Sequence, residues 1–150
     1  MNSVIFFDGV CNLCNASINF IIDHDKKQFF LFSSLQSNFF KVLLSSNLDE
    51  YKISNQNGLE KVTPSIQSEL QSLNSIVYLE NKIFYTKSDA VIRIGSHLGG
   101  LFSYSYFFKI FPKSFRDGIY EWIASNRYKW FGKKESCRIP TPDLKKRFLD

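Results

Sequence analysis

Val-Ile-Phe-Phe-Asp-Gly-Val-Cys-Asn-Leu-Cys, residues 4–14, is the stretch that decides the fold class of this 150-residue chain. Its apolar residues 4–7 are stopped by Asp8 and a glycine, a pattern typical of a buried strand that ends in a tight turn. From Cys11 onward, apolar residues recur at helical spacing up to the polar run 23–27. The stretch therefore predicts a buried strand that is followed at once by a helix.

The strand and helix signals repeat directly afterwards. Residues 29–32 are again apolar and predict a second buried strand, and residues 35–43 restore the helical spacing. A β-α-β-α unit implies two parallel strands joined by a right-handed crossover, so the first helix begins at the carboxyl edge of these strands. Cys11 and Cys14 are therefore expected at this edge.

The rest of the first hundred residues predicts two more strands. Residues 45–63 are polar and predict a loop, and a short helix is expected over 64–73. Two β-favouring runs, 75–79 and 82–86, predict a hairpin, and a helix is expected over 88–98. The sequence thus predicts about four strands.

The C-terminal third predicts helices rich in aromatic residues. An aromatic helix is expected over 101–111 and an amphipathic helix over 115–123. A chain of 150 residues has the length of one ordinary domain. We expect an α/β fold in a single domain, 1–150, whose core of about 1–100 has a mixed sheet of about four strands with flanking helices. A helical extension and tail follow over about 101–150.

The net charge of +5 is placed unevenly, because residues 113–150 hold 10 basic and 5 acidic side chains whereas residues 1–112 hold 9 of each. The acidic residues are interspersed, so a solvated helix face explains this basic end more simply than nucleic-acid binding, which we do not expect. No segment approaches the roughly 20 apolar residues of a membrane span, and the N-terminus lacks the pattern of a signal peptide. We expect a cytoplasmic protein.

The chemistry of the chain is expected at its Cys-x-x-Cys pair. Cβ atoms at i and i+3 of a helix lie about 5–6 Å apart, close enough for a disulfide. A helix N-terminus stabilises a thiolate on its first turn, so we expect Cys11 to be the exposed, attacking sulfur. Cys14, one turn deeper on the packed face, is expected to be the resolving thiol. Asp8 is interpreted either as a proton relay for the cysteines or as a turn-stabilising residue.

Five further residues are candidate accessory site residues, each with a plainer interpretation. Cys137 is a third redox thiol or an ordinary buried cysteine. Arg127 and Arg138 bind a thiolate or an anionic group, or form ordinary surface salt bridges. Ser88 and Asp89 cap the helix that they open, or they lie beside the cysteine pair.

Two other functions compete with redox chemistry. A Cys-x-x-Cys pair is also half of a zinc site, but zinc needs four ligands and only Cys137, His24 and His97 remain as soft ligands. We therefore expect no metal and no cofactor. The other rival is a non-catalytic binding module that docks a partner through the aromatic helices at 101–131.

The sequence resembles the DCC family of thiol-disulfide oxidoreductases, which is named for an Asp-x-x-Cys-x-x-Cys signature. The residues that carry the resemblance are Asp8, Cys11 and Cys14, then Ser88-Asp89-Ala90, Arg127-Tyr128, Phe131-Gly132, Cys137-Arg138-Ile139-Pro140 and Arg147-Phe148-Leu149. The resemblance implies a thioredoxin-like fold and a redox role, but no defined substrate. We expect the substrate to be a protein or small-molecule thiol or disulfide. Ser75-Ile76 opens the third strand where thioredoxin has a proline facing the cysteines, so we expect substrate docking to differ from that of thioredoxin.

Overall fold

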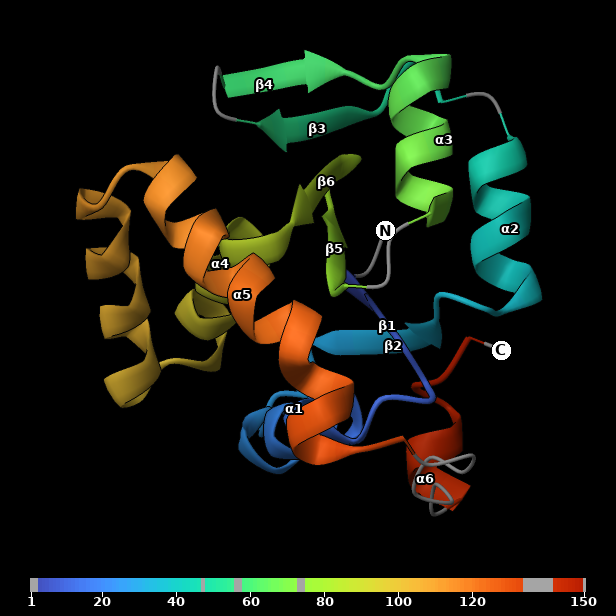
Figure 1. Ribbon diagram of the computed structural model, residues 1–150. Coiled ribbons are helices and arrows are strands. Elements are labelled where there is room, and N and C mark those ends of the chain that lie inside the picture. Colours follow the sequence, from blue (N-terminus) through green and yellow to red (C-terminus); the bar gives the residue numbers. More distant parts are fainter. Residues whose placement is uncertain (1–2, 47, 56–57, 73–74, 134–141, 150) are drawn as a thin grey trace.

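A mixed β-sheet with helices on both faces forms the centre of the protein (Figure 1). The computed structural model describes residues 3–46, 48–55, 58–72, 75–133 and 142–149. The strands are β1 (Ser3–Phe7), β2 (Phe30–Ser34), β3 (Lys52–Asn55), β4 (Gly58–Lys61), β5 (Val77–Glu80) and β6 (Ile83–Thr86). The helices are α1 (Asn12–His24), α2 (Asn38–Ser45), α3 (Pro64–Ser72), α4 (Lys87–Leu98), the 3-10 helix η1 (Gly100–Ile110), α5 (Lys113–Phe131) and α6 (Pro142–Lys145).

The six strands of the described sheet lie in the order β2-β1-β5-β6-β3-β4. β1 and β2 are parallel, with Ser3 opposite Phe30 and Phe7 opposite Ser34. β1 pairs antiparallel with β5, and β5 with β6. The predicted β-α-β-α unit and the hairpin of residues 75–86 are thereby confirmed, and β1 is an interior strand between β2 and β5.

Alternate residues of β1 face two separate hydrophobic layers, as the period of a strand requires. Val4 and Phe6 belong to the layer beneath α2 and α3, whereas Ile5 and Phe7 belong to the layer beneath α1 and α4. All four side chains are almost fully buried. A strand covered on both faces is continuously apolar, which is why this segment predicts a central strand from sequence alone.

The expectation of about four strands and of a loop over 45–63 is wrong, because β3 and β4 form a hairpin there. β4 is exposed throughout and β3 has no fully buried residue, so neither shows the apolar alternation that identifies a strand. β3 is held in the sheet by its pairing with β6 and by contact of Tyr51 with Phe84, and β4 forms the sheet edge. The sequence signal for the hairpin is Asn57-Gly58, a strong turn-forming pair.

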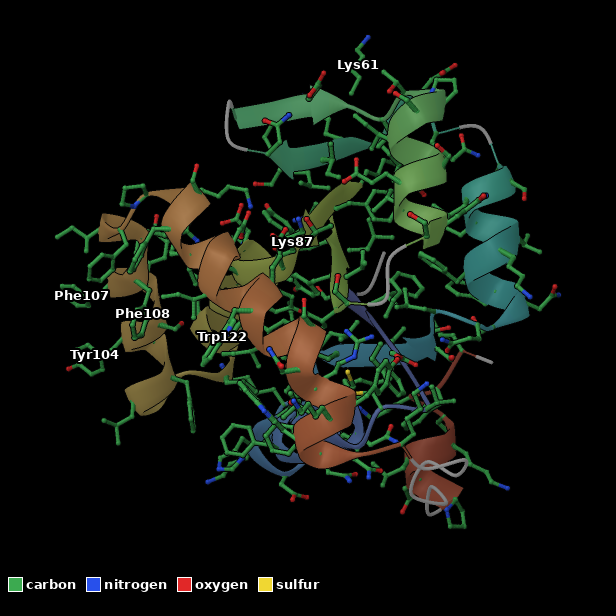
Figure 2. All side chains as sticks on the ribbon, viewed as in Figure 1. Lys61, Lys87, Tyr104, Phe107, Phe108 and Trp122 are labelled. Atoms are coloured by element: carbon green, nitrogen blue, oxygen red, sulfur yellow. The ribbon has the colours of Figure 1, made fainter. Side chains whose placement is uncertain are left out.

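Two expectations for the later helices also need correction. Helix α4 begins at Lys87 after the N-cap residue Thr86, so Ser88 and Asp89 lie in its first turn and do not cap it. Residues 100–110 are helical, as expected for 101–111, but they form a 3-10 helix in which no residue is buried. Figure 2 shows Tyr104, Phe107 and Phe108 pointing outward from it. No helix in the described part of the chain is long and apolar enough to cross a membrane.

The C-terminal residues pair with the free edge of β2. Phe32 donates its N–H to the carbonyl of Arg147 at 2.7 Å and accepts from the N–H of Leu149 at 2.8 Å. The guanidinium of Arg147 forms a buried ion pair with Asp25, whose carboxylate also accepts the N–H groups of Phe29 and Phe30 at 3.0 Å. This segment thus closes one edge of the sheet.

Replacing Arg147 with alanine should lower the free energy of unfolding by about 3–5 kcal/mol, since it leaves the buried carboxylate of Asp25 without its counter-ion. Urea denaturation measures this loss. Lys146→Ala is the matched control, because Lys146 is exposed and should change stability by less than about 0.5 kcal/mol. Equal effects of the two substitutions would contradict the role given to Arg147.

Candidate redox site

Asp8, Cys11 and Cys14 lie where β1 ends and α1 begins. Cys11 is the N-cap residue of α1, with extended φ and ψ of −89° and 120°. Its Sγ accepts a hydrogen bond from the backbone N–H of Cys14 at 3.4 Å. Both cysteines are free thiols. The sulfur of Cys11 thus occupies the position of a capping oxygen, where an N–H donor and the positive end of the helix favour negative charge.

The expected order of exposure of the two thiols is wrong. Cys11 is fully buried, whereas Cys14 is only partly buried. The cover over Cys11 comes from the end of α5: Cys11 forms a β-bridge with Lys133, and Asn12 donates its N–H to the carbonyl of Gly132 at 3.4 Å. The side-chain amide of Asn12 also donates to the carbonyl of Phe131 at 2.8 Å. A first-turn cysteine is therefore shielded by chain that lies about 120 positions away in sequence.

Cys14 holds its proton tightly. Burial is the main cause that raises the pKa of its thiol from 9.0 to about 12, followed by its hydrogen bond to Cys11 and the charge of Cys11. The guanidinium of Arg127 acts in the opposite direction and lowers this pKa, and the carboxylate of Asp8 raises it. The two thiols are thus electrostatically linked to each other and to the buried charges beside them.

Asp8 is almost fully buried, and four donors surround its carboxylate. Oδ1 accepts the N–H of Val10 and the side-chain amide of Gln36, both at 3.2 Å. Oδ2 accepts the guanidinium Nη2 of Arg127 at 3.2 Å and the hydroxyl of Tyr128. The bond to Val10 is the one that the turn-stabilising interpretation requires. The proton-relay interpretation stays a prediction.

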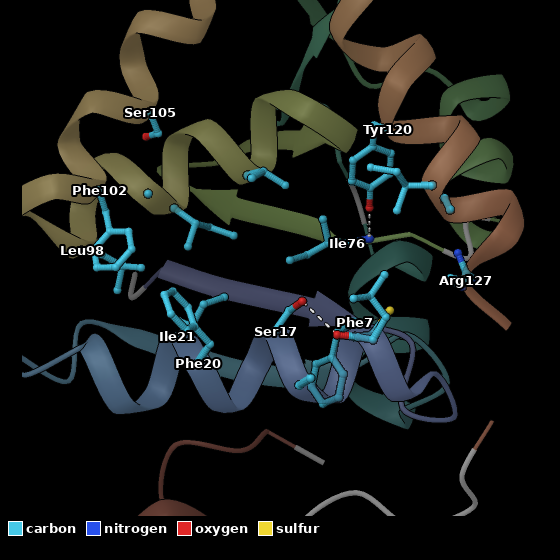
Figure 3. A pocket seen from close by; sticks show the side chains of 18 residues that line it. Phe7, Ser17, Phe20, Ile21, Ile76, Leu98, Phe102, Ser105, Tyr120 and Arg127 are labelled. Carbon is cyan, nitrogen blue, oxygen red and sulfur yellow. Dashed lines mark hydrogen bonds between the residues drawn. The ribbon is translucent and has the colours of Figure 1, made fainter. Parts of the chain in front are cut away.

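Arg127 is not the surface residue that the plainer interpretation expected. Its side chain is buried and forms an ion pair with Asp8, which is buried as well. Arg127 lies seven positions after Tyr120, about two helical turns, so both lie on one face of α5 and line the same cavity (Figure 3). Arg127 Nε is buried without a hydrogen-bond partner. The structure therefore brings the predicted accessory residue Arg127 into the site.

Sequence reasoning missed Gln36 and Tyr120 as site residues, and it named Tyr128 only as part of the Arg127-Tyr128 motif. Tyr120 accepts the N–H of Ile76 at 3.1 Å, and burial raises the pKa of its hydroxyl to about 12. Helical spacing to Arg127 is the signal that identifies Tyr120. Tyr128 adjoins Arg127 in sequence, whereas Gln36 lies in the loop after β2 and carries no recognisable pattern.

The other accessory candidates do not join this group. Ser88 donates its hydroxyl to Asp117, and Asp89 binds Lys113 at 3.1 Å and Arg116 at 3.0 Å. These contacts fasten the start of α4 to the start of α5. Cys137 and Arg138 lie outside the residues that the structure describes, so their roles stay predictions.

The described residues contain no group of three or more His, Cys, Asp or Glu side chains that is placed to hold a metal ion. His24 Nδ1 lies 2.8 Å from the carbonyl oxygen of Phe20, and His97 Nε2 lies 2.7 Å from Glu80. A metal bound by the cysteine pair would therefore need further ligands from elsewhere.

A cavity of about 640 Å³ opens beside Cys14, between α1, α4, η1 and α5 (Figure 3). Cys14 and Arg127 both belong to its wall, and Cys11 does not. Of the two sulfurs, the one on the cavity wall is therefore that of Cys14.

Comparison with known proteins agrees with this picture. The family model described as DCC1-like thiol-disulfide oxidoreductase matches residues 5–133. The chain is 41% identical over 148 residues to the uncharacterized protein YuxK of Bacillus subtilis (strain 168), covering 99% of this chain and 94% of that protein. It is 34% identical over 137 residues to the chloroplastic DCC family protein At1g52590 of Arabidopsis thaliana, covering 91% and 69%. No solved structure gives a significant match. The resemblance that the sequence motifs carry is thereby confirmed.

Alkylation of Cys14 should be slow at neutral pH and should accelerate up to about pH 12. Only the thiolate reacts, and a pKa of about 12 in place of 9.0 makes the thiolate fraction at pH 7 about a thousandfold smaller. Iodoacetamide labelling across pH, read by peptide mass, measures this profile. The control is the urea-unfolded chain, in which Cys14 should titrate near 9.0, and a plateau of the folded protein below pH 10 would contradict the prediction.

Changing the two buried charges should move this profile in opposite directions. Asp8→Asn removes a charge that raises the pKa of Cys14, so the profile should shift to lower pH, whereas Arg127→Met should shift it to higher pH. Asp23→Asn, an exposed change near the far end of α1, should leave the profile in place. Superimposable profiles for wild type and both site variants would show that these charges do not act on Cys14.

Proposed function

We propose, from the premise that this chain belongs to the DCC1-like thiol-disulfide oxidoreductase family, that Cys11 and Cys14 form a reversible disulfide that exchanges electrons with thiol or disulfide substrates. The observation that carries the proposal is that two free thiols lie together at the start of α1, where Cys11 Sγ accepts a hydrogen bond from the backbone N–H of Cys14. Cys-x-x-Cys pairs at helix N-termini are suited to such exchange, because thiolate formation is favoured there.

Cys14 is the sulfur that we assign to the substrate, and Cys11 is the resolving sulfur. This reverses the roles expected from the sequence. Two observations support the reversal: Cys14 is partly exposed on the wall of a cavity, and Cys11 is covered by the end of α5. An incoming disulfide is larger than either thiol and reaches only an accessible sulfur.

The exchange follows two steps. The Cys14 thiolate attacks one sulfur of the substrate disulfide, so a mixed disulfide forms, the substrate S–S bond breaks and the first substrate thiol leaves with a proton. The Cys11 thiolate then attacks the sulfur of Cys14, which closes the intramolecular disulfide and releases the second thiol. Two electrons and two protons pass from the pair to the substrate, and a thiol donor of the cell reverses the steps.

The environment of Cys11 suits it to the second step and to its reverse. In the reverse direction an incoming thiolate attacks Cys14, and Cys11 is the leaving group. A leaving thiolate departs faster when its negative charge is stabilised, and the N-cap position supplies an N–H donor and the helix dipole. Cys14 must lose its proton before the forward direction begins, and the charge of Arg127 favours that loss by lowering the pKa of Cys14.

We assign Asp8 and Arg127 supporting roles. Arg127 lowers the pKa of Cys14 and so favours its thiolate. Asp8 holds Arg127 in place and stabilises the turn into α1 through Val10. Proton transfer by Asp8 remains part of the proposal, since its carboxylate lies at the end of β1 directly before the cysteine turn.

The described fold is consistent with a thioredoxin-like arrangement, which we propose for the core. The order β2-β1-β5-β6, with α1 and α4 on one face, supports it, and β3 and β4 extend the sheet beyond it. The division into a core of about 1–100 and an extension of about 101–150 within one domain stays a prediction, as does the cytoplasmic location. The Arabidopsis relative is named as chloroplastic.

The rival function of partner docking is favoured by one observation. Leu101, Phe107 and Ile110 on η1 are 83%, 71% and 82% exposed, which is unusual for large apolar side chains on a protein surface. Docking and redox exchange are separable, because docking needs no cysteine. Zinc content after purification under reducing conditions tests the metal-binding form of this rival, which predicts stoichiometric metal.

Cys11→Ser should trap mixed disulfides on Cys14, because the substrate-facing sulfur then lacks its resolving partner. Incubation of the variant with glutathione disulfide, followed by mass analysis, should yield one adduct on the peptide that contains Cys14. Cys14→Ser should give little adduct on the buried Cys11. Adducts on Cys11 alone would restore the reverse assignment, and failure of the wild type to form an internal disulfide would remove the redox function.

A further inference from the structure

The cavity beside Cys14 is elongated and almost entirely apolar. On α1 it follows the helix from Cys14 to Ile21, a distance of about 10 Å at the 1.5 Å rise of a helix. Leu98 and Phe102 line the end away from the cysteine (Figure 3). Its volume of about 640 Å³ falls within the range of small-molecule sites, about 300–1,000 Å³.

The charged end of the cavity lies near Cys14. Arg127 is the one charged residue among the described lining residues, and its Nε is buried without a hydrogen-bond partner. The hydroxyls of Ser17 and Ser105 already donate to the carbonyls of Leu13 and Ile92, at 2.9 and 3.2 Å. The far end therefore offers a ligand apolar contact, and the near end offers it a thiol and an unused cationic N–H donor.

An extended peptide is a poor occupant of such a site. A peptide backbone brings an N–H and a carbonyl with every residue, and these groups need partners once they leave water. The N–H of Ile76, on the segment before β5, is already bonded to Tyr120. The lining supplies too few free donors and acceptors for a backbone, but it suits the hydrocarbon body of a small molecule.

The geometry points to a small-molecule substrate of the Cys11–Cys14 pair: a thiol or disulfide on an elongated hydrocarbon body, with an acidic or hydrogen-bond-accepting group beside the sulfur. The body lies along α1, the acceptor faces Arg127 Nε and the sulfur meets Cys14. This inference rests on the proposed function, because it names the substrate class of that exchange. The bond changes are those of the two steps above, with the substrate disulfide as the oxidant.

The first test uses alkyl methanethiosulfonates of increasing chain length on the Cys11→Ser variant. Each reagent forms a disulfide between Cys14 and its alkylthio group and releases methanesulfinate, so the rate at Cys14 is read from peptide mass. Burial of the chain should raise the rate by up to about fourfold for each methylene that enters the cavity. The octyl reagent should therefore react at least about tenfold faster than the methyl reagent.

Two neighbouring residues of α5 supply the matched variants. Ala124 lines the cavity, and Ala124→Phe fills it, so the ratio of octyl to methyl rates should fall toward one. Ser125 is exposed and is not among the lining residues, so Ser125→Phe should keep the ratio. Equal rates for the methyl and octyl reagents in the Cys11→Ser variant, or equal ratios in the two phenylalanine variants, would overturn the cavity assignment.

The acceptor group is tested on the wild-type protein by calorimetric titration with octanoate and with octylammonium. Octanoate should bind at least about tenfold more tightly, because a cation is repelled at the Arg127 end. Equal affinities would overturn the acceptor assignment. These measurements need no disulfide in the protein, so loss of chain-length dependence counts against the substrate class alone, whereas a wild type that forms no internal disulfide counts against the redox function alone.

Discussion

The buried ion pair between Asp8 and Arg127 is the constraint on which the site depends. It joins the end of β1, an interior strand of the sheet, to the last turns of α5, 119 positions later in the chain. Two charges removed from water require each other, since a lone buried charge costs several kcal/mol. Once Arg127 is fixed, the helix end that follows it lies against the start of α1 and covers Cys11.

The same ion pair gives the two sulfurs different surroundings. The side of α1 near Cys11 is closed by Gly132 and Lys133, and the side near Cys14 opens into an apolar cavity. Burial keeps Cys14 protonated, and the nearby guanidinium partly opposes that effect. The exposure of the two sulfurs and the proton affinity of Cys14 thus arise from one arrangement of β1, α1 and α5.

The parts of the molecule that follow local rules were predictable from the sequence. β1 and β2 are short continuous apolar runs, and α1 has apolar residues at helical spacing. These signals place the cysteine pair where β1 ends and α1 begins. The β3–β4 hairpin was not predictable in this way, because its strands bury too little surface to need apolar residues. The exposure of the thiols was also missed, since the cover over Cys11 depends on tertiary contact with residues far away in sequence. Gln36 likewise joins the site through a contact distant in sequence, its hydrogen bond to Asp8, and no local sequence pattern identifies it.

The bridge between Cys11 and Lys133 has a consequence for the protein during its synthesis. During synthesis at about 5–20 residues per second, Lys133 is added about 6–24 s after Cys14. Until then a nascent chain holds both thiols without the shelter of α5, at a stage when its apolar strands are also unpaired. Oxidation or capture by another thiol in this interval would lock the first turn of α1 before its cover exists. Cys11 is therefore covered only after α5 has folded against the start of α1.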